Sequence, residues 1–302
     1  MTSIEVRKLS KRFGNVLAVD QLDFEVAPGR VTGFLGANGS GKTTTLRILL
    51  GLSAPTSGSA TFGGRRYVDL DDPIREVGAA IAPDTFHPGR SGVEHLRVMS
   101  TAAGIKRSRV DEVLGDVGLA DAAGRRVGGY SLGMRQRLSL AAALLGDPRI
   151  LILDEPLNGL DPDGIAWMRV LLRHLATEGR TVFLSSHLLA EIAQTVDDVV
   201  VITDGRLAAA KPLADLGSGT VTVVRTPDAT RLLAALTASG YPARIGGTDR
   251  VEAPGVPADV VGRIAAQAGI VIAGLAEERD DLEQMFRELT HPKEAQACTS
   301  PA

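Results

Sequence analysis

Short apolar runs and amphipathic stretches alternate along the first two thirds of the chain. Apolar runs at residues 4–8, 22–27, 31–35, 150–153 and 181–185 predict strands. A helix is predicted at residues 42–50, directly after a glycine-rich loop. Another is predicted after Asp161, which suits the N-cap position and is followed by Pro162 at the first helical position. This alternation predicts an α/β fold with a parallel sheet and crossover helices.

The remaining residues predict a helical insert and a second unit. Apolar residues recur at helical spacing within residues 93–146, which interrupts the strand and helix alternation. Residues 220–290 predict strand, helix, strand, strand, helix, strand and helix, with the last strand at residues 269–275; this is a ferredoxin-like α+β order. The domains we expect are a first domain at residues 1–215, a small accessory domain at residues 216–290 and a flexible tail at residues 291–302.

Composition and charge narrow the classes of protein that fit this pattern. Hydrophobic residues make up 44% of the chain and aromatic residues only 4%, so the predicted core is aliphatic. The formal net charge of -3 argues against nucleic-acid binding, which favours a basic surface. The single Cys298 excludes a disulfide scaffold and thiolate metal clusters. No signal-peptide pattern or apolar run of membrane-spanning length is found, so we expect a cytoplasmic protein.

The segment GANGSGKT, residues 36–43, fits the pattern Gly-x-x-x-x-Gly-Lys-Ser/Thr between a predicted strand and a predicted helix. Its glycines let backbone N–H groups surround an anion at a helix N-terminus, Lys42 supplies a positive charge to the β- and γ-phosphates, and Thr43 offers a hydroxyl to Mg²⁺. The nucleotide-binding residues predicted here are Gly36, Asn38, Gly39, Ser40, Gly41, Lys42, Thr43 and Thr44.

A second candidate lies in ILILDEP, residues 150–156, where a buried apolar strand ends in two carboxylates. Such a pair is costly at a strand end unless it meets a cation or a hydrogen-bond partner, and Mg²⁺ is the natural candidate. We expect Asp154 to hold the metal through water and Glu155 to polarise the attacking water.

Five segments resemble, in the same order, the nucleotide-binding subunit of an ATP-binding cassette (ABC) transporter over about residues 1–215. They are the phosphate loop, YSLGMRQR at 130–137, ILILDEP, NGLD at 158–161 and SSH at 185–187. The resemblance implies a P-loop ABC cassette, a mixed sheet core with a helical signature subdomain, that binds ATP and Mg²⁺. It also implies two copies packed head to tail around two nucleotides, and a separate integral membrane permease that holds the chain at the inner face of the cell membrane.

The resemblance assigns roles to residues beyond the phosphate loop. Ser131 and Gly133 match the turn that meets the γ-phosphate of ATP held by the other subunit, and the donors and dipole of a helix start suit an anion. His187 matches the switch histidine that reaches the γ-phosphate, and Asp161 matches a loop that crosses the dimer interface. Phe13 matches the ring that stacks on adenine.

The signature turn departs from the family pattern. Leu132 and Met134 stand where the family usually has the first signature glycine and the signature glutamine. The segment FHPGRSGVEHLRVM and the C-terminal LEQMFRELT resemble subfamilies whose permeases export drugs, peptide antibiotics or lipid-linked compounds.

A second departure concerns the family's glutamine that touches metal and transporter, which falls on Ala82 here. Alanine can do neither task. Either Asp84 or His87 substitutes for the glutamine from a shifted loop, with Asp84 favoured, or Glu155 and His187 carry out the hydrolytic step without it.

The function predicted from these features is an ATPase that powers export through a separate permease. Two alternatives stay open: a soluble ABC-type switch acting on DNA or ribosomes, and a metabolic P-loop kinase. The first would usually carry coiled-coil inserts, paired cassettes or basic stretches. The second would not need the signature turn or His187.

Overall fold

The computed structural model describes residues 2–81, 86–216 and 220–279. The chain divides into two compact units, Met1–Lys211 and Pro212–Ala302. Each unit has its own cluster of buried apolar side chains.

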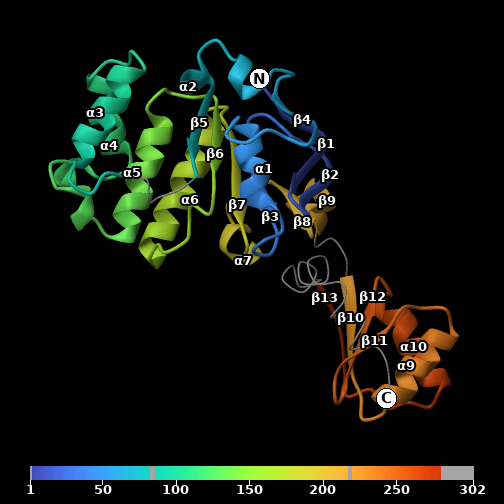
Figure 1. Cartoon of the computed structure of the whole chain (residues 1–302). Coiled ribbons are helices and arrows are strands. Elements are labelled where there is room, and N and C mark those ends of the chain that lie inside the picture. The colour runs from blue at the N-terminus through green and yellow to red at the C-terminus, as the bar shows by residue number, and fades with distance from the viewer. Residues whose placement is uncertain (1, 82–85, 217–219, 280–302) are drawn as a thin grey trace. The chain divides into compact units, whose positions relative to one another are not determined.

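A six-stranded sheet forms the centre of the first unit (Figure 1). Its strand order is β5-β6-β7-β3-β8-β9, and the neighbouring pairs from β5 to β8 are parallel. The strands are β3 (Val31–Leu35), β5 (Val77–Ala80), β6 (Ile150–Leu153), β7 (Thr181–Ser186), β8 (Asp198–Thr203) and β9 (Arg206–Pro212). Every residue of β3, β6 and β7 is buried, as expected for parallel strands covered on both faces. Because β3 and β6 both flank β7, their carboxyl ends meet at one edge of the sheet.

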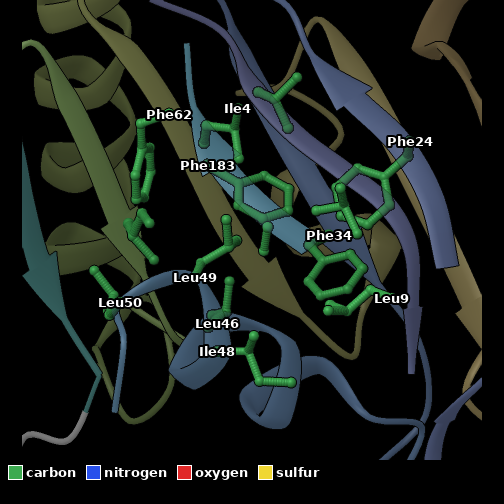
Figure 2. Close-up of a cluster of buried hydrophobic side chains, with 14 of the residues drawn as sticks. Ile4, Leu9, Phe24, Phe34, Leu46, Ile48, Leu49, Leu50, Phe62 and Phe183 are labelled. Atoms are coloured by element: carbon green, nitrogen blue, oxygen red, sulfur yellow. The ribbon is translucent and has the colours of Figure 1, made fainter. Parts of the chain in front are cut away.

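An antiparallel sheet of order β2-β1-β4 packs against this centre. Its strands are β1 (Ile4–Phe13), β2 (Val16–Val26) and β4 (Ser57–Phe62). β1 and β2 are longer than predicted because they form one hairpin that stays paired as far as Phe13 and Val16. Figure 2 shows the core between the sheets, where Phe24 of β2 meets Phe34 and Phe183 with ring centroids 5.6 and 5.9 Å away. The core thereby joins the sheet that carries the phosphate loop to the hairpin that carries Phe13.

The helices follow the predicted order. The predicted insert contains three α-helices that lie together on one side of the first unit in Figure 1: α3 (Gly92–Ala102), α4 (Ser108–Asp116) and α5 (Leu132–Leu144). Ser91 and Glu94 form a capping box at α3. The other helices and turns are α1 (Lys42–Leu49), η1 (Tyr67–Asp69), α2 (Pro73–Glu76), η2 (Ala120–Ala122), η3 (Val127–Gly129), α6 (Pro162–Thr177), α7 (Leu189–Ile192) and α8 (Leu213–Leu216). Helix α6 begins as predicted, with Asp161 as N-cap and Pro162 in its first turn.

Besides α8, the described part of the second unit is an antiparallel sheet of order β11-β12-β10-β13 with two helices. Its elements are β10 (Thr220–Arg225), α9 (Ala229–Ala238), β11 (Arg244–Gly247), β12 (Arg250–Pro254), α10 (Ala258–Gln267) and β13 (Gly274–Arg279). Its core includes Leu232 of α9, Val261 of α10 and Val251 of β12.

The last strand corrects the prediction. We expected it at residues 269–275, but β13 starts at Gly274 and carries the polar sequence GLAEER. β13 is an edge strand, and its pairing with β10 from Arg225↔Gly274 to Thr220↔Arg279 determines its position more than apolar content does. The helix expected within residues 282–290, the tail 291–302 and Cys298 lie outside the described residues.

Candidate functional site

The glycine loop connects β3 to α1 and is packed tightly against neighbouring backbone. Gly41 is the N-cap residue of α1 with φ of 104°, and a Cβ there would lie 2.5 Å from the Ala18 carbonyl oxygen. A Cβ on Gly36 would lie 2.5 Å from the Ile202 carbonyl oxygen. Both positions therefore require glycine. Among the described residues the buried Ser40 hydroxyl has no hydrogen-bond partner, so it is available to a ligand in the loop. Asn38 and Gly39 are exposed at the loop tip, and Thr44 is half-buried.

Lys42 directs its ammonium group into the loop. The side chain is 6% exposed, and Nζ donates to the carbonyl oxygens of Gly36 at 2.7 Å and Ala37 at 3.3 Å. Nζ also lies 3.5 Å from Oε1 of Glu155. A buried cation encircled by a loop at a helix N-terminus is the arrangement expected of a phosphate site.

Asp154 directly follows β6 and is 9% exposed. Its Oδ2 accepts a 2.8 Å hydrogen bond from the Thr43 hydroxyl, and its Oδ1 accepts one from Ser185 on β7. The carboxylate and the hydroxyl predicted to hold Mg²⁺ thus face each other across the sheet edge. Oxygen donors of this kind suit Mg²⁺, which keeps several waters and few protein ligands.

Glu155 and His187 meet although 32 residues separate them in the sequence. His187 Nδ1 lies 2.9 Å from Glu155 Oε2, and the two side chains are 31% and 23% exposed. Glu155 adopts a left-handed backbone conformation with φ of 50°, which a non-glycine residue rarely adopts. The carboxylate is held between Lys42 and His187, with one oxygen directed to each.

Ser185 is a site residue that the motif analysis did not single out. Its hydroxyl donates to Asp154 Oδ1 and accepts a 2.9 Å bond from the Glu155 backbone N–H. It therefore links the Asp154 carboxylate to the Glu155 backbone. The signal in the sequence was its place two residues before His187 in the SSH segment.

Phe13 lies at the turn end of the β1–β2 hairpin, where it pairs with Val16, and is 52% exposed. The ammonium of Lys11 lies 4.8 Å from the centroid of its ring. Ala18, farther along β2, is the residue whose carbonyl oxygen closes on Gly41. The same hairpin thus carries an exposed ring and borders the phosphate loop.

The signature turn is exposed and contacts the loop that precedes α6. Ser131 caps α5 and accepts a 3.2 Å hydrogen bond from the Met134 backbone N–H. A Cβ on Gly133 would lie 3.3 Å from Leu160 Cδ2. Asp161 caps α6 by accepting a 2.8 Å bond from the Gly164 backbone N–H.

The residues proposed for the shifted loop are only partly visible. Ala82 and Asp84 lie outside the described residues. His87 is exposed, and its Nδ1 accepts a 3.2 Å hydrogen bond from the Gly89 backbone N–H.

A groove of about 520 Å³ opens between α1, β5 and α3. Its lining includes Arg47, Tyr67, Ile81, Phe86, His95 and Met99. The rings of Phe86 and His95 meet edge to face with centroids 4.8 Å apart. Burial lowers the pKa of His95, and the nearby Arg90 lowers it further. The groove is therefore largely apolar at neutral pH, with the exposed Arg47 contributing a positive charge.

Comparison with protein families and curated proteins gives consistent matches. A family described as ABC transporter matches residues 19–158, and a family described as a domain of unknown function matches residues 220–283. The bacitracin transport ATP-binding protein BcrA of Bacillus licheniformis is 46% identical over 209 residues, which cover 68% of each chain. The lantibiotic transport ATP-binding protein SrtF of Streptococcus pyogenes is 35% identical over 204 residues, 68% of this chain and 88% of the other.

Solved structures agree on the fold. An ATP-binding subunit of an ABC transporter has a TM-score of 0.64 at 26% identity, over 70% of this chain and 91% of that one. A dimeric ATP-binding cassette in a post-hydrolysis state, bound to ADP and Pi, has a TM-score of 0.64 at 24% identity, over 70% of this chain and 98% of that one. The described residues contain no helix long and apolar enough to cross a membrane.

Proposed function

The chain belongs to the ABC transporter ATP-binding proteins, ATPases that act in transporters, and on that premise we propose that it powers export of a drug, peptide antibiotic or lipid-like compound through a separate membrane permease. The observation that carries the proposal is the convergence of Lys42, Asp154, Glu155 and His187 at one edge of the parallel sheet. The names of the bacitracin and lantibiotic relatives support antibiotic-like cargo.

ATP fits the residues of the phosphate loop. Lys42 would exchange its carbonyl contacts and the Glu155 carboxylate for the β- and γ-phosphates, and the free Ser40 hydroxyl would gain a partner. Phe13 would stack on the adenine ring, which gives affinity with little base selectivity. Thr43 and Asp154 would hold Mg²⁺, which neutralises phosphate charge and orients the γ-phosphate when bound.

Glu155 is the general base in this proposal. It would take the proton of the attacking water, while His187 holds the carboxylate and approaches the γ-phosphate. Ser185 would orient Asp154 and hold the Glu155 backbone in place through its two hydrogen bonds.

A second copy completes the site in this proposal. Ser131 is exposed and Gly133 half-buried at the start of α5, where Gly133 lies beside Leu160 of the loop before α6. An ATP held by a partner chain would approach this turn from its outer side. Two copies would pack head to tail with two nucleotides between them. Asp161 would cross the interface while it caps α6.

The groove that contains Phe86 and His95 is the proposed docking place for the permease, which would keep the chain at the inner face of the cell membrane. Its lining includes Ala79 and Ala80 of β5, so a force on the groove would reach the edge strand of the catalytic sheet. We also propose that residues 1–215 form the ATPase domain and residues 216–290 an accessory domain.

The test combines hydrolysis with co-purification. Purified chain should hydrolyse ATP only with Mg²⁺, and tagged chain co-expressed with the neighbouring permease gene should bring the permease out of detergent-solubilised membranes. Arg47→Glu, which reverses the charge in the groove, should weaken this recovery, whereas Arg97→Glu, an exposed arginine outside the groove lining, should not. Mg-dependent hydrolysis without any permease recovery would favour the soluble ABC-type switch instead.

A further inference from the structure

Leu132 stands at the position of the usual first signature glycine, and its side chain covers Gly159. Gly159 has a left-handed φ of 75°. A Cβ built on Gly159 would lie 2.1 Å from Leu132 Cδ2 and 3.0 Å from Leu132 Cγ. The leucine therefore fills the space that a side chain at position 159 would need. The rest of the Leu132 side chain is exposed, with 39% of the residue accessible to solvent.

Other residues of α5 hold the same neighbourhood. Gln136 is 7% exposed, and its Nε2 lies 3.4 Å from the Asn158 carbonyl oxygen. The Arg137 guanidinium lies 4.1 Å from the centroid of the Trp167 ring on α6. The start of α5 is thus attached to the loop of residues 158–161 and to the helix that follows it.

This loop is joined directly to the proposed base. The Asn158 backbone N–H donates to the Glu155 carbonyl oxygen at 3.1 Å, and the Leu160 N–H donates to Leu157 at 3.2 Å. Glu155 already occupies a left-handed conformation that its surroundings must maintain. A displacement of the loop would therefore change the backbone angle at Glu155.

We propose that Leu132 is a positioning residue that couples the signature turn to Glu155 of its own chain through Gly159. The proposal rests on the head-to-tail dimer of the proposed function, in which the signature turn meets the partner's ATP. When Ser131 and Gly133 engage that phosphate, α5 carries the 158–161 loop with it and aligns the base in the other composite site. A glycine at position 132 would have no side chain with which to hold Gly159.

The kinetic test uses Leu132→Ala, with Leu132→Met as the conservative control. Leu132→Ala should lower the kcat of ATP hydrolysis by at least about threefold, within the range of mutations that disturb a coupling element. The dissociation constant of a fluorescent ATP analogue for the isolated chain should change less than about twofold, because Lys42 and its loop are untouched. Leu132→Met fills nearly the same volume and should retain kcat.

A thermal test without nucleotide examines the contact itself. Gly159→Ala should lower Tm more in the wild-type chain than in Leu132→Ala, because the remaining Leu132 Cβ lies 4.0 Å from the new methyl group. Gly179→Ala is the matched control: Gly179 has a φ of 90°, and a Cβ there meets nothing within 4 Å, so its Tm loss should be equal in both backgrounds.

The outcomes separate this proposal from the proposed function. A wild-type kcat in Leu132→Ala, an equal loss in Leu132→Met, or equal Tm losses for Gly159→Ala in both backgrounds would overturn the coupling. A wild-type chain that does not hydrolyse ATP at all would contradict the ATPase cycle itself, whatever the thermal result.

Discussion

Replacement of Glu155 by glutamine tests the centre of the candidate site. The side chain keeps its size and can still contact His187 and Lys42, which lie 2.9 and 3.5 Å from its two oxygens. What it loses is the ability to accept a proton from water. The fold should persist, because the backbone N–H still bonds Ser185.

The magnitude follows from the role. A positioned general base contributes roughly 10² to 10⁴ in rate, which corresponds to about 2.7 to 5.4 kcal/mol of activation free energy. ATP affinity should be retained or increased, since the neutral amide forms no ion pair with Lys42 and does not repel the γ-phosphate. The variant should therefore accumulate as an ATP-bound dimer.

The assay measures steady-state phosphate release and, in parallel, dimer formation with ATP by size-exclusion chromatography. Glu112→Gln on α4 is the matched control, because that glutamate is 55% exposed and pairs only with Arg109 among the described residues. It should behave as wild type. Wild-type turnover in Glu155→Gln would remove the residue from the role of base, and a loss of ATP binding would show that its contact with Lys42 builds the phosphate site.

Three further predictions address other parts of the chain. Lys42→Ala should weaken ATP binding itself, as measured by titration, and an unchanged affinity would contradict its assignment. The variants Lys42→Ala and Gly133→Asp should each be inactive alone. When the two variants are mixed under conditions that exchange subunits, ATPase activity should partly return, because one composite site of the mixed dimer is intact. A mixture as inactive as each variant would contradict the head-to-tail site. The pKa of His95 is lowered in the folded chain, so the unfolded chain binds the proton more readily. The free energy of unfolding should therefore decrease as the pH falls from about 6.5, the usual histidine pKa, toward 5. His95→Gln should remove this part of the pH dependence of Tm, and an unaltered profile would assign it to other groups.

Local features of the sequence were sufficient for much of the fold. The phosphate loop could be predicted because its glycines, lysine and threonine lie within eight consecutive residues. The segments before and after it have the hydrophobic patterns of a strand and of a helix, respectively. The start of α6 could also be predicted from neighbouring residues. Asp161 accepts a hydrogen bond from a free backbone N–H of the first turn, and Pro162 has no backbone N–H that needs a partner there. The position of β13 was not predictable in this way, because an edge strand takes its place from the pairing with β10.

The sequence by itself determined the order of elements and the chemical types available at each strand end: a lysine after β3, two carboxylates after β6 and a histidine after β7. Only the tertiary structure decided that these groups meet, because the order β6-β7-β3 places ends from distant parts of the chain side by side. The same holds for Ser185, which bonds the Asp154 carboxylate and the Glu155 backbone N–H, and for Leu132, which covers Gly159. Spacing along the chain carries no information on such contacts, since they depend on how the sheet and α5 pack.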